Sequence, residues 1–233
     1  AAKLNAAKCY IFSDVDGIYT TDPKQTKIAR KIDTLSYTEM LDIADEGAKV
    51  LHNRCVEVGE KFKVPIIAKS TFFDNNGTII NNKIEGGYVK NIVKNDNIQY
   101  VHITSKKSYT LDQFNNIYNS FIEEELGVKN LVNSSELSLD ISFTLPKQKF
   151  TKLAALLERK YSDLKSEYLD ITRISIIGNG IMSNNVVLNK TMEIIKQNKL
   201  EIISMEINET KIAIMFKKII SNKILEELHE NLI

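Results

Sequence analysis

The first part of the chain alternates between short apolar runs and segments with apolar residues at helical spacing. Ser36-Tyr37-Thr38-Glu39 fits the S-x-x-E capping box, which predicts that a helix begins there. Gly47 interrupts this helix, and apolar residues from Ala48 to Phe62 predict a second one. Three apolar runs are predicted to be strands: Cys9–Phe12, Val64–Ala68 and Thr78–Ile80. This order of elements is typical of an α/β domain.

Beyond residue 84 the pattern changes to a repeat. Helices are predicted at 111–126, 150–161, 186–197 and 223–232, and strands at 84–93, 99–104, 128–132, 139–145, 172–177, 201–205 and 211–216. The strand–helix pairs 141–161 and 212–232 lie about 70 residues apart, which indicates two copies of one unit. Helices that return to one side of an antiparallel sheet predict two α+β sandwiches of the ferredoxin-like kind.

Composition narrows the class without identifying the chain. With 233 residues, 43% hydrophobic and 26% charged, the chain is neither disordered, collagen-like nor a coiled coil. A net charge of +1 argues against nucleic acid or an anionic membrane as a partner. No apolar run approaches the ~20 residues of a membrane span. Cys9 and Cys55 are too few for a disulfide framework and fit a reducing compartment, so we expect a cytoplasmic protein.

The first residues are unusual because Ala1–Lys8 contains neither an initiator Met nor a signal peptide. This stretch is interpreted as the end of an amphipathic helix that leads into a strand. We therefore expect the chain to begin in the middle of a domain.

The most distinctive local string follows the first predicted strand. It places Asp14, Asp16 and Gly17 at the carboxyl end of that strand, where α/β proteins bind ligands. The simplest interpretation is a turn that reverses the chain. A calcium loop is excluded, because counting from Asp14 puts Ile18 at position 5 and Gln25 at position 12.

The D-x-D-G string is also similar to the haloacid-dehalogenase-like phosphatases. There Asp14 would be the nucleophile and Asp16 the general acid/base. Lys69 and Ser70 could take the place of the middle motifs of that class. However, the late acidic pair that holds Mg²⁺ is missing, because 174–180 ends in Gly-Asn-Gly.

A third similarity extends along most of the chain. The blocks S-D-V-D-G-I-Y-T-T-D-P (13–23), I-D-T-L-S-Y-T-E-M (32–40) and G-A-K-V-L-H (47–52) resemble the aspartokinases. Further matches follow at 65–66, 69–72, 77–80, 134–136 and 140–144. The resemblance implies an α/β C-terminal lobe of an amino-acid kinase domain (1–83), followed by two α+β ferredoxin-like ACT modules of βαββαβ topology. The first module (99–170) would be inserted into the second (84–98 plus 171–233).

The activity implied by this resemblance is transfer of the ATP γ-phosphoryl group to the side-chain carboxylate of L-aspartate, with Mg²⁺. Ser13 and Asp14 would border the nucleotide, Tyr19 would lie near the adenosine, and Lys24 and Lys49 would reach the phosphates. Lys24 stands where the family usually has Arg, so a bidentate phosphate contact is lost. Lys49 also follows Gly47 at the predicted start of a helix, where a bound phosphate is favoured.

The family's K-x-G-G block and aspartate-binding residues do not occur in this chain. The catalytic residues are therefore expected upstream, and the chain alone should not phosphorylate aspartate. An alternative within the same family is a separate regulatory subunit that binds an amino acid.

ACT modules usually bind an amino-acid effector and pair across subunits, so the resemblance implies a homodimer. The effector would be lysine by analogy, with threonine or no effector left open. The effector residues implied are Ser105, Lys106, Tyr109, Val128, Asn130, Ser134, Ser135 and Glu136. The alternative interpretation of these residues is a polar turn on a structural module.

Weaker signals predict no further site. His52 and Cys55 are spaced H-x-x-C, but no second pair would complete a zinc site. His102 and His229 have no candidate catalytic partner in the sequence. We therefore expect no protein-bound metal centre.

Overall fold

The structure is a computed structural model, and it describes residues 1–48, 50–83, 88–134, 138–183 and 185–233. The chain forms two compact units. The larger unit comprises Ala1–Asn95, Arg173–Phe216 and Ile220–Ile233, and the smaller comprises Asp96–Thr172 and Lys217–Ile219. Two long strands, β5 (Asn91–Ser108) and β8 (Lys165–Ile177), contribute residues to both units.

A four-stranded sheet in the larger unit has the order β1-β3-β4-β2. Its strands are β1 (Cys9–Ser13), β2 (Thr34–Ser36), β3 (Ile66–Ser70) and β4 (Thr78–Asn81). β1 pairs with β3 in parallel, β2 pairs with β4 in parallel, and β3 is antiparallel to β4. A short 3₁₀ helix, η1 (Ala2–Leu4), precedes β1 in place of the expected end of an amphipathic helix.

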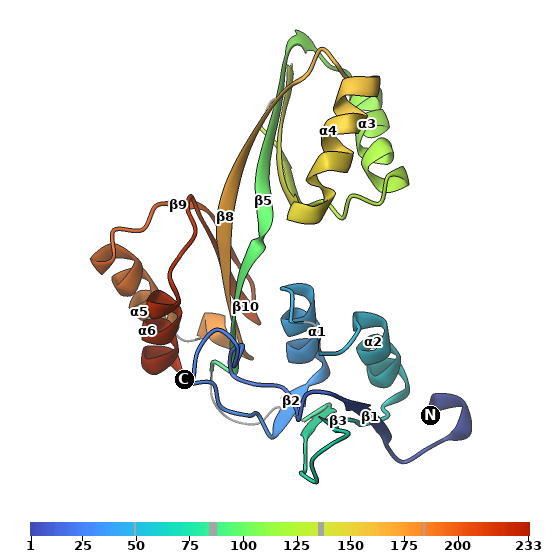
Figure 1. Ribbon diagram of the computed structural model, residues 1–233, viewed down its shortest axis with the longest axis vertical. Coiled ribbons are helices and arrows are strands. Elements are labelled where there is room, and N and C mark those ends of the chain that lie inside the picture. Colours follow the sequence, from blue (N-terminus) through green and yellow to red (C-terminus); the bar gives the residue numbers. More distant parts are fainter. Residues whose placement is uncertain (49, 84–87, 135–137, 184) are drawn as a thin grey trace. The chain divides into compact units, whose positions relative to one another are not determined.

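One face of this sheet is covered by helices α1 (Tyr37–Asp45) and α2 (Asn53–Phe62), which lie side by side in Figure 1. Met40, Ile43 and Val56 from the helices share a buried cluster with Ile66 and Ile80 from the sheet. The helix α1 begins at the predicted capping box, since Ser36 accepts from the Glu39 N–H and the Glu39 carboxylate accepts from the Ser36 N–H.

The rest of the larger unit is an α+β sandwich with its own core. The antiparallel pair β9 (Ile202–Ile207) and β10 (Lys211–Phe216) continues toward β8 and the first part of β5. Helices α5 (Asn185–Gln197) and α6 (Asn222–Leu232) contribute Ile194, Leu225 and Leu228 to this core, and a 3₁₀ helix, η3 (Ile181–Ser183), precedes α5. Ile177 and Val93 contact the core of the four-stranded sheet instead, so the two parts of the larger unit pack directly on each other.

The smaller unit has the second sandwich. Strands β6 (Lys129–Asn133) and β7 (Ser138–Pro146) pair antiparallel, and β7 pairs with β5. Helices α3 (Leu111–Glu123) and α4 (Phe150–Lys160) lie on the same side of these strands in Figure 1, and η2 (Lys147–Lys149) leads into α4. The core contains Phe121 and Phe143, whose ring centroids are 5.2 Å apart.

Several predicted boundaries were wrong, among them the start of β8, which was predicted at 172 and lies at Lys165. The second helix begins at Asn53 rather than Ala48, because His52 caps it through Nδ1, which accepts the Arg54 N–H. The two strands predicted at 84–93 and 99–104 are one strand, β5, which begins at Asn91, while 84–87 lie outside the described residues. β5 also continues to Ser108, so the predicted effector residues Ser105 and Lys106 lie within a strand.

Candidate functional site

The D-x-D-G string lies at one edge of the four-stranded sheet. Because β1 and β3 are parallel, their carboxyl ends meet, and Ser13 is paired with Ser70. The Thr71 N–H donates to the Ser13 carbonyl oxygen at 2.8 Å, and the Val15 N–H donates to Ser13 Oγ at 3.3 Å. Asp14 follows at this edge with an exposed carboxylate. This is the edge of an α/β sheet at which ligands bind.

Gly17 and Thr78 fix the bend after this edge. Thr78 Oγ1 accepts from the Ile18 N–H at 2.8 Å and donates to the Ile32 carbonyl oxygen at 2.6 Å. Gly17 has a φ of +149°, and a Cβ there would lie 2.7 Å from Thr78 Oγ1. A side chain at position 17 would therefore displace the hydroxyl that holds the bend.

Tyr19 and Asp16 bond to each other within this bend. The Tyr19 hydroxyl donates to Asp16 Oδ1 at 2.7 Å, and Lys31 Nζ lies 3.8 Å from Asp16 Oδ2. The hydrogen bond to the Asp16 carboxylate, together with partial burial, raises the pKa of Tyr19. The phenol therefore stays protonated, and its half-buried ring is held in one orientation.

The segment continues to an exposed lysine, Lys24, whose N–H donates to Asp22 Oδ1 at 2.9 Å. Thr21 Oγ1 is buried without a hydrogen-bond partner among the described residues. A buried hydroxyl without a partner fits a site that another molecule or water completes. Ser13 at the end of β1 and Asp14, Tyr19 and Lys24 beyond it thus lie on one continuous segment, residues 13–24.

Lys49 lies outside the described residues, so its position relative to this loop segment stays a prediction. The helix-dipole argument for it was wrong. The helix α2 begins at Asn53, so Lys49 is not in its first turn. Only the motif match now supports Lys49.

A buried ion cluster, formed by Glu46, Arg173 and Lys211, lies where α1 ends. Arg173 Nε and Nη2 donate to the Glu46 carboxylate at 2.7 and 3.1 Å, and Lys211 Nζ donates at 2.9 Å. Ser175 Oγ donates to the same carboxylate at 2.7 Å, and Arg173 also reaches Glu206 at 2.9 Å. The cluster joins α1 to β8 and β10 within the larger unit.

Burial by itself would raise the pKa of Glu46, but its cationic and hydroxyl donors outweigh that effect. Hydrogen bonds and charge from Arg173, with Lys211 and Ser175, lower the pKa from 4.5 to about 2. The carboxylate therefore stays ionised although its side chain is only 7% exposed. The sequence alone does not reveal this cluster, because Arg173 and Lys211 are 127 and 165 residues from Glu46 and no local pattern connects them.

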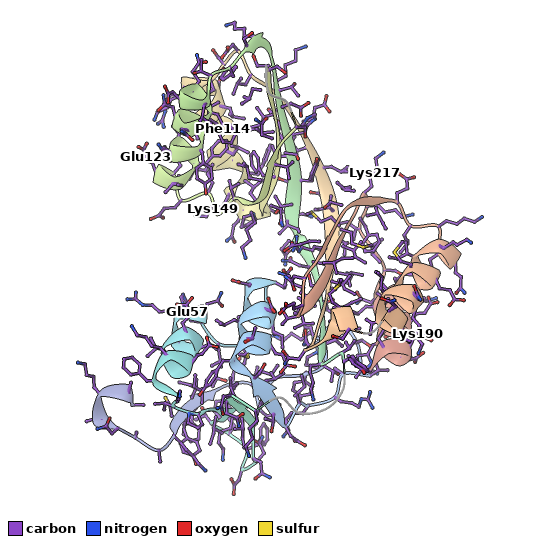
Figure 2. The ribbon with its side chains drawn as sticks, turned by 180° about the vertical axis from the view of Figure 1, so that it is seen from behind. Glu57, Phe114, Glu123, Lys149, Lys190 and Lys217 are labelled. Atoms are coloured by element: carbon purple, nitrogen blue, oxygen red, sulfur yellow. The ribbon has the colours of Figure 1, made fainter. Side chains whose placement is uncertain are left out.

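A cavity of about 500 Å³ lies in the smaller unit. Its lining combines apolar groups with hydroxyl and amide groups, which suits a small amphipathic ligand. The lining residues are Tyr109, Thr110, Leu111, Phe114, Asn133, Ser134, Ser138 and Leu139. They come from the start of α3, where Figure 2 labels Phe114, and from the segments around β6 and β7.

Comparison with known proteins gives the family context of this arrangement. The amino acid kinase family matches residues 1–70. An aspartokinase of Geobacillus stearothermophilus is 31% identical over 237 residues, covering 99% of this chain and 58% of that protein. The chain is thus similar in sequence to aspartokinases along nearly its whole length. Aspartokinase 2 of Bacillus subtilis is 30% identical with the same coverage, so the chain spans a little over half the length of these relatives.

Solved structures show that the fold is also that of aspartokinases. The structure of E. coli aspartokinase III in complex with aspartate and ADP superposes with a TM-score of 0.81 at 22% identity, covering all of this chain and 54% of that one. The regulatory subunit of Thermus thermophilus aspartate kinase superposes with a TM-score of 0.54 and covers 63% of this chain. The predicted fold class, a kinase lobe with ACT-like α+β modules, is confirmed.

In this aspartokinase-like chain, two of the predicted effector residues, Tyr109 and Ser134, line the cavity. Ser105, Val128 and Asn130 are not among its lining residues. Asn130 adopts a positive φ of 55° and accepts from Thr144 Oγ1 at 3.2 Å, a contact within the β6–β7 pair.

The remaining predicted effector residues are described only in part. Lys106 lies in β5, and the structure describes its backbone only. Ser135 and Glu136 lie outside the described residues.

His102 and His229 have partners that the sequence did not reveal. His102 Nε2 lies 2.8 Å from Asp140 Oδ1, and His229 Nε2 lies 2.7 Å from Thr20 Oγ1. Within the described part of the chain, no three His, Cys, Asp or Glu side chains gather into a metal site. Among the same residues, no helix has the length and apolar character needed to cross a bilayer.

Proposed function

We propose that this chain supplies the nucleotide-binding lobe and the regulatory modules of an aspartokinase, which phosphorylates L-aspartate with ATP to give 4-phospho-L-aspartate. The observation that carries the proposal is the similarity to aspartokinases along 99% of the chain. The E. coli enzyme whose fold it shares was crystallised with aspartate and ADP. A phosphatase has no comparable support, because the similarity to that class is confined to D-x-D-G.

The loop segment 13–24 supplies groups suited to a nucleotide. Asp14 and Ser13 border it at the sheet edge, the fixed ring of Tyr19 offers a face for the adenosine, and Lys24 offers a cation to the phosphates. Lys49 is the second cation proposed. Mg²⁺ would offset the charge of the phosphates, and among the described residues no three His, Cys, Asp or Glu side chains gather to hold it without the nucleotide.

The cavity of the smaller unit is proposed to bind an amino-acid effector, with lysine as the first candidate. Its hydroxyl and amide groups can bond the α-amino and α-carboxylate groups, and Leu111, Phe114 and Leu139 can contact an aliphatic side chain. A second structure of E. coli aspartokinase III, in complex with lysine and aspartate, superposes with a TM-score of 0.80.

The proposed organisation is a kinase lobe at 1–83, a first ACT module at 99–170 and a second made of 84–98 plus 171–233. The smaller unit, Asp96–Thr172 with Lys217–Ile219, has a core of its own, which supports an inserted module. A cytoplasmic homodimer that pairs through these modules is part of the proposal. It includes no nucleic-acid or membrane partner.

The decisive experiment compares the chain alone with a full-length enzyme that contains it. The chain corresponds to 58% of its relatives, so we expect it to be inactive alone and the full-length enzyme to phosphorylate aspartate. A full-length enzyme without aspartate- and ATP-dependent ADP release would refute the function. Activity from the chain alone would refute the proposal that the catalytic residues lie outside this chain.

The role of Lys49 is tested separately in the full-length enzyme. Lys49→Ala should reduce kcat/KM for ATP by roughly 100-fold or more, because a cation that compensates phosphate charge is lost. Lys63→Ala, at the exposed C-cap of α2, is the control and should leave the kinetics unchanged. Unchanged turnover and KM for ATP in Lys49→Ala would reject the assignment.

A separate regulatory subunit is the second candidate, because the Thermus thermophilus regulatory subunit matches along 99% of its own length. That match covers only 63% of this chain, and residues 1–70 match the amino acid kinase family instead. A chain that binds lysine in calorimetry, and that activates or inhibits a separate catalytic chain, would favour this alternative.

A further inference from the structure

The proposed nucleotide segment forms a ribbon that doubles back on itself. The Thr20 N–H donates to the Arg30 carbonyl oxygen and the Ile32 N–H donates to the Ile18 carbonyl oxygen, both at 2.8 Å. Tyr19 and Lys24 lie on this ribbon, defined here as residues 18–32. Their placement therefore depends on what holds the ribbon.

The last helix of the chain holds one end of the ribbon. Thr20 Oγ1 lies 2.7 Å from His229 Nε2 of α6, and the Arg30 N–H donates to the same hydroxyl at 3.0 Å. Thr20 is 8% exposed and His229 is 2% exposed. A buried hydrogen bond between neutral groups fixes the position of Thr20, because water cannot replace either partner.

The helix α6 also holds the turn of the ribbon. Thr26 Oγ1 donates to Glu226 Oε1 at 2.7 Å, and Asn222 Nδ2 donates to the Gln25 carbonyl oxygen at 2.9 Å. Asn222, Glu226 and His229 are spaced four and three residues apart, so they lie on one face of α6. Glu227, on another face, accepts from Asn198 at the end of α5 instead.

The start of β5 adds two bonds to the same stretch. The Ile92 N–H donates to the Thr20 carbonyl oxygen at 2.8 Å, and Asn91 Nδ2 donates to the Tyr19 carbonyl oxygen at 2.6 Å. The ribbon is therefore held by β5 and α6, both of which belong to the proposed second ACT module, in addition to its contacts with the kinase lobe.

We propose that Asn222, Glu226 and His229 of α6 are positioning residues for ATP, which act by holding Tyr19 and Lys24 in place without touching the nucleotide. This proposal rests on the function proposed above. The helix α6, which belongs to the proposed second ACT module, would then help to shape the nucleotide-binding segment of the kinase lobe. A shift of α6 would therefore change ATP binding through the placement of Tyr19 and Lys24.

The test uses the full-length enzyme that contains this chain. His229→Leu and Glu226→Met remove the bonds to Thr20 and Thr26, whereas His229→Gln and Glu226→Gln keep a polar end group of similar reach. Glu227→Met is the matched control, because it lies on the same helix and has a comparable half-buried side chain. For each variant, kcat, the KM for ATP and amide hydrogen exchange of residues 18–32 are measured.

We expect the loss variants to raise the KM for ATP by about threefold to tenfold each, the range that corresponds to one hydrogen bond, with kcat within about twofold. Exchange should accelerate in the ribbon but not in β1 or β3. In the Gln variants the KM for ATP should stay close to the parent value. Glu227→Met should have the kcat, the KM for ATP and the hydrogen exchange of the parent.

Three results would overturn the proposal. A KM for ATP at the parent value in both loss variants, or an equal rise in Glu227→Met, would reject the positioning role while the aspartokinase function stands. A parent enzyme that does not phosphorylate aspartate would reject the function, and the positioning role with it.

Discussion

At the scale of single residues, Glu46 determines how the end of α1 is held against β8 and β10. An ionised carboxylate with a 7% exposed side chain is tolerated only because Arg173, Lys211 and Ser175 surround it. Removing one member leaves the others as buried charges without full compensation. The cluster therefore stabilises the fold only as a complete set.

Glu46→Gln should lower the free energy of unfolding by about 3 kcal/mol, the usual cost of removing one partner from a buried pair. Glu206→Gln, which removes the more exposed partner of Arg173, should cost less than about 1 kcal/mol. Chemical denaturation at neutral pH measures both. Equal losses in the two variants would contradict the assigned roles.

The same carboxylate predicts a pH dependence. The pKa of Glu46 is lowered in the folded chain from 4.5 to about 2, so its stabilisation is complete above pH 4.5 and is lost as the pH falls toward 2. Glu46→Gln should therefore unfold with a weaker dependence on pH across this window. A parent and variant with parallel pH profiles between pH 4.5 and 2.5 would disprove the lowered pKa.

His229 should make stability depend on pH in a separate, higher pH range. Burial and the nearby Arg30 lower the pKa of His229 below 6.5, and Glu230 opposes this only in part. The folded chain therefore resists protonation that the unfolded chain accepts, so stability falls as the pH drops below 6.5. His229→Gln should reduce the loss of unfolding free energy between pH 7.5 and 5.5. The prediction fails if the loss is as large as in the parent.

At the scale of elements, local signals placed most helices and strands correctly. The capping box at Ser36 marked the start of α1, and the apolar periodicities marked α3 to α6. The wrong boundaries are those that tertiary contacts determine. His52 delays the start of α2, and pairing with β7 and β8 extends β5 through the polar stretch Lys94–Asn97, which has no apolar signal of its own.

The candidate site follows the same division. The motifs predict Ser13, Asp14, Tyr19 and Lys24 because those residues lie close together in sequence, whereas nothing local indicates that α6 bonds to Thr20 and Thr26 of the same segment. Of the eight residues that line the cavity, only Tyr109 and Ser134 are among the predicted effector residues, and Asn130 bonds to Thr144 instead. Hydrogen-bond partners that are far apart along the chain leave no pattern that a single sequence reveals.

The capping box gives a direct test at this scale. Ser36→Ala should lower the free energy of unfolding by about 1 kcal/mol, because the Glu39 N–H at the start of α1 loses its acceptor. Ser221→Ala is the matched control: Ser221 is the N-cap residue of α6, but its side chain makes no capping bond, so the change should stay within about 0.5 kcal/mol. Equal effects of the two substitutions would contradict the capping role.

At the scale of the whole molecule, the chain contains two units with separate cores. Each core can lose its packing without the other, so unfolding need not be a single transition. An effector that binds only the cavity of the smaller unit should stabilise that unit first.

Lysine at 100 times its dissociation constant should stabilise the smaller unit by about 2.7 kcal/mol. Hydrogen exchange should show protection centred on residues 96–172. Ser134→Tyr, which fills the cavity from an exposed position, should abolish the effect, and Val132→Tyr, exposed on β6 but not lining the cavity, should preserve it. Protection that persists in Ser134→Tyr would place the effector elsewhere.

The cluster around Glu46 also limits how this protein can change over generations. Replacing Glu46, Arg173 or Lys211 alone passes through an intermediate with an uncompensated charge inside the protein. Homologues should therefore either keep all three charges or replace them together with apolar residues. Positions 46, 173 and 211 are thus expected to covary, although any two of them are at least 38 positions apart in the chain.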